Sequence, residues 1–376
     1  MGHRNDIREK DRKNSFIFLT IRRVLSAYAL LITSLPVFSI YMPAALMTVS
    51  GCSVTGPVRP CDEVGQDMGR HETVLRLKSA EGNSPHIREI DLFIFNDDAL
   101  KRLDSYQKFD TDIGNTVTAA SRKGKKILVA IANSGKPAED WAGINSMDAI
   151  MDVTADLRNE NPDSMTMGGT AYADMGVDME CSMVLTPLIS GIYINSIRCD
   201  FSGRPYEGLE LHDARVYLTN VNASARIFSE DGFKPISIIN AGRLSDTDMN
   251  SLSCPEMLLK TIDDNIGDEA CRIGAALYCY PNDCPEETAG SPFTRLVIEG
   301  SLDGKTYYYP VNINRPSAGA LAAGKNGISR NCRYIYDITV TRSGTIDPDI
   351  VADPSMIQVR CDILPWEELE EDEIDF

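Results

Sequence analysis

Short stretches of apolar residues recur along most of the chain and predict a succession of β-strands. Residues 73–78 alternate apolar and polar side chains, which is typical of a strand with one buried face. Residues 89–96 are rich in β-forming side chains, and residues 126–133 form an almost wholly apolar run. Further strands are predicted at residues 183–185, 191–197, 214–218, 295–299, 305–311, 334–341 and 356–363.

Turn signals and one short helix separate these strands. Asp303-Gly304 predicts a tight hairpin turn, because this pair accepts the positive φ angles that such turns require. The spacing of apolar residues between 145 and 157 predicts a short helix, with Asn145 or Ser146 as its N-cap. Residues 168–176, rich in Gly and Met, are predicted to form a loop.

Many short strands with turns between them are typical of β-sandwiches, whereas no long amphipathic helix is evident. The sequence therefore predicts an all-β protein with a few short helices. The boundary between two sandwich domains is expected near residues 180–192, after the Gly- and Met-rich segment.

The N-terminal segment has the pattern of an export signal. Residues 1–23 are basic, and residues 24–49 carry no charge. Such a basic region followed by an apolar region and small residues is typical of a secretory signal, and the basic flank stays inside. An uncleaved membrane helix is the alternative, since about 20 apolar residues span a bilayer. Pro36 and Pro43 disfavour one unbroken helix.

The apolar segment ends in Val49-Ser50-Gly51-Cys52, which looks like a bacterial lipobox. This motif predicts cleavage after Gly51 and a diacylglycerol on the thiol of Cys52. Two or more acyl chains give stable membrane anchoring. No cofactor other than this covalent lipid is predicted. An ordinary signal peptide and a later start codon remain alternatives.

Length and charge limit the classes of function. The 376 residues suggest two domains after removal of the signal. We expect a signal peptide at 1–51, a tether at 52–70, and domains at 71–190 and 191–376, the second with an acidic tail. The net charge of −18 argues against nucleic-acid binding, because phosphate contacts need a basic surface.

Sequence motifs for chemistry are scarce. The chain has ten Cys, but no Cys-x-x-Cys pair that would predict a zinc site, and disulfide connectivity cannot be deduced. It also lacks a P-loop, a Gly-x-Ser-x-Gly elbow and a His-Glu-x-x-His motif. We therefore expect a protein that is not an enzyme, with a lipid-anchored hydrolase as the least favoured alternative. Tyr307-Tyr308-Tyr309 suggests a carbohydrate platform, although alternate strand residues face opposite sides.

Several segments together resemble the Bacteroidales fimbrillin-like family, the lipoprotein subunits of type V pili. The order and spacing of these segments carry the resemblance, since each is weak alone. They are Cys52 with Arg59-Pro60-Cys61, residues 87–98, residues 129–133, residues 294–310, residues 329–334 with an Arg-Asn-x-x-Tyr pattern, and the terminal strand ending at Trp366.

The resemblance implies two tandem transthyretin-like β-sandwich domains and display on the cell outer membrane as part of a surface-exposed fimbrium that supports adhesion. The implied partners are other fimbrial subunits and outer-membrane lipid, with a host or bacterial surface ligand as a further candidate. Shaft subunits of the family are cut at an arginine, which opens a groove for a neighbour's strand. Arg59, Arg70 and Arg76 are the candidate cleavage sites here.

The Pro60-Cys61 pair so close to Cys52 is similar to the lipidated anchor and minor-subunit branch, whose members keep their lipid. The many other cysteines also depart from what we expect of a shaft subunit. We therefore favour an anchor or accessory role over a shaft role. A surface glycan- or ligand-binding lipoprotein is the alternative function.

Overall fold

The computed structural model describes residues 69–79, 86–111, 113–228, 235, 237–284, 290, 292–315, 326–350 and 352–365. These residues are mostly in β-strands, with a few short helices, so the expected all-β class is confirmed. No helix within them is long and apolar enough to cross a membrane. The signal peptide predicted for residues 1–51 lies outside the described residues.

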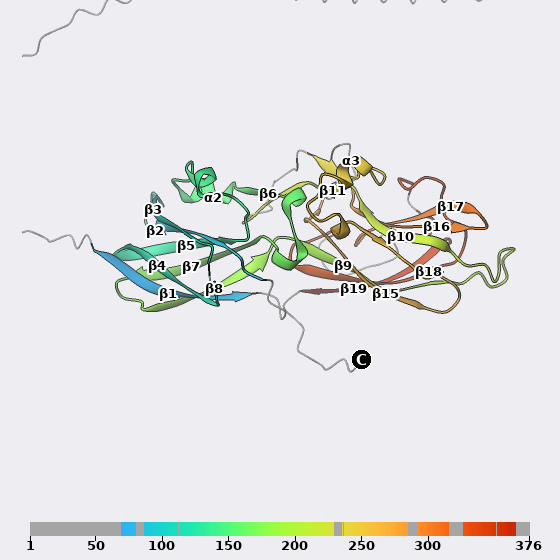
Figure 1. Cartoon of the computed structure of the whole chain (residues 1–376), viewed down its shortest axis with the longest axis horizontal. Helices are drawn as coiled ribbons and strands as arrows, with labels where there is room; N and C mark the ends of the chain where they lie inside the picture. The colour runs from blue at the N-terminus through green and yellow to red at the C-terminus, as the bar shows by residue number, and fades with distance from the viewer. Residues whose placement is uncertain are drawn as a thin grey trace, which may run out of the picture. The chain divides into compact units, whose positions relative to one another are not determined.

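The N-terminal part of the described chain is built on seven strands in the order β3-β2-β5-β7-β8-β1-β4 (Figure 1). Strands β7 and β8 pair only through Met167 and Gly168, so the strands divide there into two layers. The strands are β1 (Arg70–Ser79), β2 (Ile90–Asn96), β3 (Leu103–Phe109), β4 (Thr116–Arg122), β5 (Gly124–Ala132), β7 (Met167–Met175) and β8 (Glu180–Pro187).

Side chains join β3 and β4, the two edge strands of this sheet. The Ser105 hydroxyl donates to the Ala120 carbonyl at 3.0 Å. Arg122 donates its backbone N–H and its Nε–H to the Asp104 carboxylate, at 3.0 and 2.6 Å. The edges therefore face each other, and the sheet encloses a core as a sandwich does.

The core between the two layers is made of residues that alternate along each strand. Strands β1, β2, β5 and β8 contribute large aliphatic side chains, while β7 contributes Met167, Ala171, Ala173 and Met175. The buried members include Leu75, Leu77, Ile90, Leu92, Ile94, Leu128, Met175, Met183 and Leu185.

Strands β2 and β5 are buried on both faces, which explains their continuous apolar sequences. The outer face carries Phe93, Phe95, Ile127, Val129 and Ile131, and it belongs to a second hydrophobic cluster. Figure 1 shows the segment after β5 lying over these strands. This segment contains η1 (Ala138–Trp141), α2 (Met147–Met151), β6 (Thr154–Asp156), η2 (Leu157–Asn159) and η3 (Pro162–Ser164).

The C-terminal part contains two four-stranded sheets around the rest of the second cluster, in the orders β14-β10-β16-β17 and β15-β9-β18-β19. Their strands are β9 (Ser190–Cys199), β10 (His212–Thr219), β14 (Leu259–Thr261), β15 (Cys271–Cys279), β16 (Arg295–Leu302), β17 (Lys305–Asn312), β18 (Cys332–Val340) and β19 (Ile357–Pro365). The remaining elements are β11 (Val221–Asn222), β12 (Ser224–Arg226), β13 (Ile238–Ile239), α3 (Asp246–Met249) and η4 (Pro255–Met257).

Backbone pairing joins the two parts of the described chain. Strand β6 of the N-terminal part pairs with β12 of the C-terminal part, and Arg226 forms an ion pair with Asp152 at 2.9 Å. Arg330 donates to the Ile227 carbonyl at 2.6 Å and to the Thr186 carbonyl at 3.4 Å. The second hydrophobic cluster also runs through both parts. The division into domains at residues 190 and 191 therefore stays a proposal.

The segment at residues 168–176 was predicted to be a loop, and that prediction is wrong. It forms β7, which pairs with β5 along its whole length. A Cβ atom on Gly169 would lie 2.5 Å from the Val184 carbonyl oxygen, so glycine here permits close strand approach rather than a turn. Strands β3 and β4 were not predicted, since their sequences are less apolar, and β15 was not predicted either.

The predicted hairpin and helix are confirmed with different bounds. Asp303 and Gly304 both have positive φ angles, 51° and 71°, between β16 and β17. The helix α2 is shorter than expected, and the Ser146 hydroxyl caps it by accepting from the Ala149 N–H.

Candidate functional site

Strand β1 occupies an internal position in the mixed sheet of the N-terminal part. It pairs antiparallel with β4 from Arg70 to Arg76 and parallel with β8 from Val74 to Ser79. The middle of β1 is therefore hydrogen-bonded on both sides. A strand in this position leaves two unpaired strand edges if it is removed.

The side chains of β1 alternate strictly between the core and the surface. Leu75 is fully buried, Leu77 is 5% exposed, and Thr73 is 1% exposed with its hydroxyl donating to the Asp178 carbonyl at 2.7 Å. Val74 and Arg76 point outward. The strand thus inserts three inward side chains into the core through one continuous extended segment.

The slot around β1 is lined by apolar side chains of its two neighbours. Val117 and Ala119 of β4 and Met183 and Leu185 of β8 belong to the same core cluster as Leu75. Without β1, these four side chains would lose the apolar contacts that β1 provides and would be exposed to solvent. Any segment that replaced β1 would need the same alternation of apolar and polar residues.

The structure places two of the candidate cleavage sites on β1. Arg70 is the first residue of the strand, whereas Arg76 lies within the stretch that pairs on both sides. The Arg76 guanidinium is about half exposed and forms an ion pair with Glu180, with a second contact at 3.0 Å. Gly51, Cys52 and Arg59 lie outside the described residues, so nothing here tests them.

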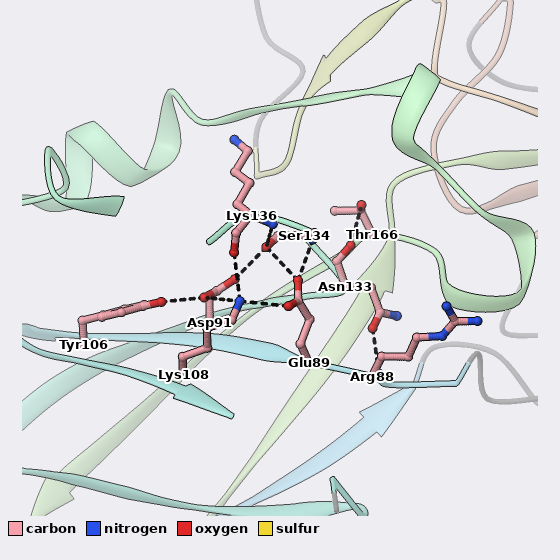
Figure 2. A network of polar contacts seen from close by, with 10 residues as sticks. Arg88, Glu89, Asp91, Tyr106, Lys108, Asn133, Ser134, Lys136 and Thr166 are labelled. Atoms are coloured by element: carbon pink, nitrogen blue, oxygen red, sulfur yellow. Dashed lines mark hydrogen bonds and ion pairs between the residues drawn. The ribbon is translucent and has the colours of Figure 1, made fainter. Parts of the chain in front are cut away.

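A network of polar contacts joins β2, β3 and the loop after β5, as Figure 2 shows. Asp91 is fully buried, and its carboxylate accepts from the Tyr106 hydroxyl at 2.7 Å and the Ser134 hydroxyl at 2.6 Å. Lys108 lies 2.8 Å from Glu89 and 3.3 Å from Asp91. A buried carboxylate needs such partners, because an unpaired buried charge is costly.

The electrostatics of this network fix its charge states. Burial lowers the pKa of Lys108, but the hydrogen bond that it donates to Glu89 and the charges of Asp91 and Glu89 outweigh that effect and raise its pKa. Burial and the hydrogen bond to Asp91 raise the pKa of Tyr106. Lys108 therefore stays protonated, and so does the Tyr106 hydroxyl. Neither group is suited to general acid–base catalysis near neutral pH.

Loops near the network surround a cavity of about 640 Å³. Lys136 lines it, with its ammonium 5.0 Å from the centre of the Trp141 ring. Glu160 lines it as well, and its carboxylate accepts from the Tyr280 hydroxyl at 2.8 Å and the Thr166 N–H at 3.0 Å. Because Tyr280 belongs to the C-terminal part, this contact ties the two parts together.

The polar groups of this region are engaged with one another. Within the described residues, no group of three His, Cys, Asp or Glu side chains is arranged to hold a metal ion. The Ser134 hydroxyl lies within hydrogen-bond distance of the Glu89 and Asp91 carboxylates, to which it donates. Its oxygen accepts from the Lys136 N–H at 3.1 Å. Tyr309 is fully buried, and Tyr307 and Tyr308 are half-buried, so these tyrosines do not form an open platform.

Eight cysteines lie within the described residues, and of these Cys199 and Cys279 are buried. Burial raises the pKa of each of these two thiols to about 12, so both behave as small apolar side chains. The other six, which are half-buried, are Cys181, Cys254, Cys271, Cys284, Cys332 and Cys361.

The polar network was not predicted from the sequence. The signal for it was Asp91, a charged residue within the apolar stretch of β2, which requires buried partners. Its partners lie on β3 and on the loop after β5, and only the fold brings them together. The predicted site residues Arg70 and Arg76, by contrast, share one strand.

Comparisons with solved structures identify the fold. A fimbrilin from Porphyromonas gingivalis superposes with a TM-score of 0.58 at 17% identity, covering 78% of this chain and 97% of that chain. The tip fimbrial protein Mfa3 from the same organism gives a TM-score of 0.50 at 13% identity, covering 79% and 100%. A candidate cell adhesion protein from Bacteroides eggerthii gives 0.56 at 15% identity, covering 79% and 96%.

These similarities show that the chain has the β-sandwich fold of fimbrillins, so the expected resemblance in fold is confirmed. No protein-family model matches the sequence, and no curated protein is significantly similar to it. The closer likeness to the lipidated branch is not tested by these findings and stays a prediction.

Proposed function

We propose that this protein is a fimbrial subunit on the outer membrane, held there by a lipid on Cys52. We further propose that it acts as an anchor or accessory subunit, without enzymatic activity. The observation that carries the proposal is the shared fold with a fimbrilin and a tip fimbrial protein, which extends over nearly four fifths of the chain.

The position of β1 supports assembly by strand addition. It is a single extended segment with three inward side chains, and it pairs with β4 on one side and β8 on the other. Removal of such a strand creates an apolar slot with two unpaired edges, which a neighbour's segment can fill. The partners that we propose are other fimbrial subunits.

The location of Arg76 argues against cleavage after this arginine in the folded protein. A protease needs an extended, accessible segment, but the backbone around Arg76 is engaged on both sides. The strand would have to leave the sheet before it could be cut there. A subunit that keeps β1 and its tether also keeps the lipid on Cys52, which an anchor requires.

Deletion of the gene in the native bacterium tests this function. Loss of an anchor should release assembled pili from the cells, so the pilus content of the medium should rise and that of the cell surface should fall. The deletion strain should regain surface pili when it expresses the wild-type chain, but not the Cys52→Ser chain, which cannot receive a thioether lipid.

Unchanged surface pili in the deletion strain would contradict the proposed function. That result would favour the alternative of a surface ligand-binding lipoprotein, for which glycan-array binding by the purified chain is the direct measurement. Complete loss of pili, both from cells and medium, would instead contradict the anchor role and support a shaft role.

A further inference from the structure

The turn between β7 and β8 carries apolar side chains that face solvent. Met179 is 86% exposed and Val177 is 66% exposed, and both lie in the connection from Met175 to Glu180. Turns favour Gly, Asn, Asp and Ser, so two large apolar residues here have no explanation in the geometry of the turn.

The turn is held together without these two side chains. Gly176 supplies the positive φ, at 89°. The Asp178 carboxylate accepts from the Asp174 N–H at 2.7 Å, and the Asp174 carbonyl accepts from the N–H groups of residues 177 and 178 at 2.9 and 2.8 Å. The Asp178 carbonyl accepts from the Thr73 hydroxyl. Polar replacements of Val177 and Met179 should therefore leave the fold intact.

The exposed apolar surface continues onto β1. The N–H of Val74 donates to the Met179 carbonyl at 2.9 Å, and the Val74 side chain is itself 38% exposed. We call Val74, Val177 and Met179 the Met179 patch. Single exposed apolar residues are ordinary, but three neighbours at one end of a sheet indicate a contact surface.

Cations gather around the same end of the sheet. Arg70, Lys123 and Lys125 are exposed at the start of β1 and at the β4–β5 turn, and a Cβ on Gly176 would lie 3.2 Å from Lys123. Of the acidic groups at this end, Glu180 pairs with Arg76 and Asp178 holds the turn, whereas Glu72 on β1 is exposed. Apolar tips beside basic side chains suit an interface between lipid headgroups and acyl chains.

The chain enters the described structure at this end. Only 17 residues separate Cys52 from residue 70, and a chain of that length spans at most about 60 Å when fully extended. A lipid on Cys52 would therefore tether the protein to the membrane through this end. The C-terminal part is farther from Cys52 along the chain.

We propose that the Met179 patch is a second, non-covalent membrane contact, which inserts into the interface of the bilayer that holds the lipid on Cys52. This inference rests on the proposed lipid anchor. Beyond the anchor, the proposal states that the folded part of the protein contacts the membrane in a fixed orientation, with its basic residues on anionic headgroups. Without this contact, the folded part would be attached through the tether alone.

Tryptophan quenching by brominated lipids tests the contact in the acylated, full mature chain. The Met179→Trp variant is placed in vesicles of phosphatidylethanolamine and phosphatidylglycerol, next to a matched Ile346→Trp variant at a site that is 83% exposed on a C-terminal loop. Stronger quenching at 179 than at 346 is the expected result. Equal quenching at both positions would overturn the proposal.

Vesicle binding of a chain without the lipid separates this inference from the anchor itself. The mature chain with Cys52→Ser should bind such vesicles weakly, and Val177→Asp with Met179→Asp should weaken that binding at least about tenfold. The control is Ile346→Asp, which should bind as the parent does. If the parent does not bind, or if the aspartate variant binds as well as the control, the contact is not with lipid.

The remaining outcomes are also distinguishable. A mature protein with no acyl group on Cys52 would remove the anchor proposal, but the vesicle measurement would still decide the membrane contact. If the aspartate variant instead loses association with other pilus subunits while vesicle binding is unchanged, the patch is a protein interface and the inference is overturned.

Discussion

Neighbouring residues on β1 have opposite roles, although they differ by one position. Leu75 is fully buried in the core of the N-terminal part, while Val74 points outward and is 38% exposed. The energy that holds β1 in its slot therefore comes from its inward side chains together with its backbone pairing. This is the residue-level basis for treating β1 as a unit that is either fully inserted or absent.

Truncation of Leu75 tests this role directly. Leu75→Ala should lower the free energy of unfolding by about 2–5 kcal/mol, because it removes a buried side chain and leaves a cavity. Val74→Ala, the matched control on the same strand, should change it by less than about 1 kcal/mol. Urea denaturation followed by circular dichroism measures both. Equal effects would mean that the strand does not insert as described.

Glu160 links stability to pH, because burial raises its pKa above the usual value of 4.5. Below that pH the carboxyl is protonated in both states. As the pH rises, the unfolded chain ionises first, so stability falls by up to about 1.4 kcal/mol per pH unit until the folded-state pKa is passed.

The difference in unfolding free energy between the wild type and Glu160→Gln should therefore favour the wild type most at about pH 4. This difference should shrink as the pH rises toward about 7. Urea unfolding of both proteins across this range measures the difference. A difference that stays constant would contradict a raised pKa for Glu160.

At the level of elements, the internal position of β1 protects the peptide bond after Arg76. Arg70 begins the strand, whereas Arg76 is paired with both neighbours. An arginine-specific protease should cut the folded protein near the start of β1 well before it cuts after Arg76. In urea that unfolds the protein, Arg76 should be cut as readily as Arg70.

Mass spectrometry of timed digests measures this order of cleavage. Rapid cutting after Arg76 in the folded protein would show that β1 leaves the sheet easily. That result would favour a shaft role over an anchor role, because a strand that opens readily can be removed by a processing protease.

The elements also show which parts of the fold could be predicted from the sequence. Strands such as β2 and β5 were predicted because two buried faces produce continuous apolar runs. Strand β7 was mistaken for a loop, since Gly168 and Gly169 suggested a turn, whereas contacts with Ile227 and Val184 from distant segments require their small size. The partners of Asp91 were equally hidden, because only tertiary structure brings Tyr106 and Ser134 to it.

At the level of the whole molecule, the two parts share one continuous hydrophobic cluster and are joined by pairing of β6 with β12. Differential scanning calorimetry should therefore show one cooperative transition, with equal calorimetric and van't Hoff enthalpies. Two separate transitions would mean that the parts unfold independently and that the junction contributes little.

Under the proposed function, the role of the chain depends on whether Cys52 stays attached to the body that contains β1. A shaft subunit loses the lipid and its tether on processing, whereas an anchor keeps both. The slot occupied by β1 and the Met179 patch both lie in the part that directly follows the tether.

The most direct test is mass spectrometry of the mature N terminus of this chain, isolated from outer membranes together with its pili. The account predicts an N-terminal peptide that begins at acylated Cys52, in a chain that still contains β1 and co-purifies with pilus subunits. A mature chain that begins after Arg59, Arg70 or Arg76, or one that never associates with pili, would contradict it.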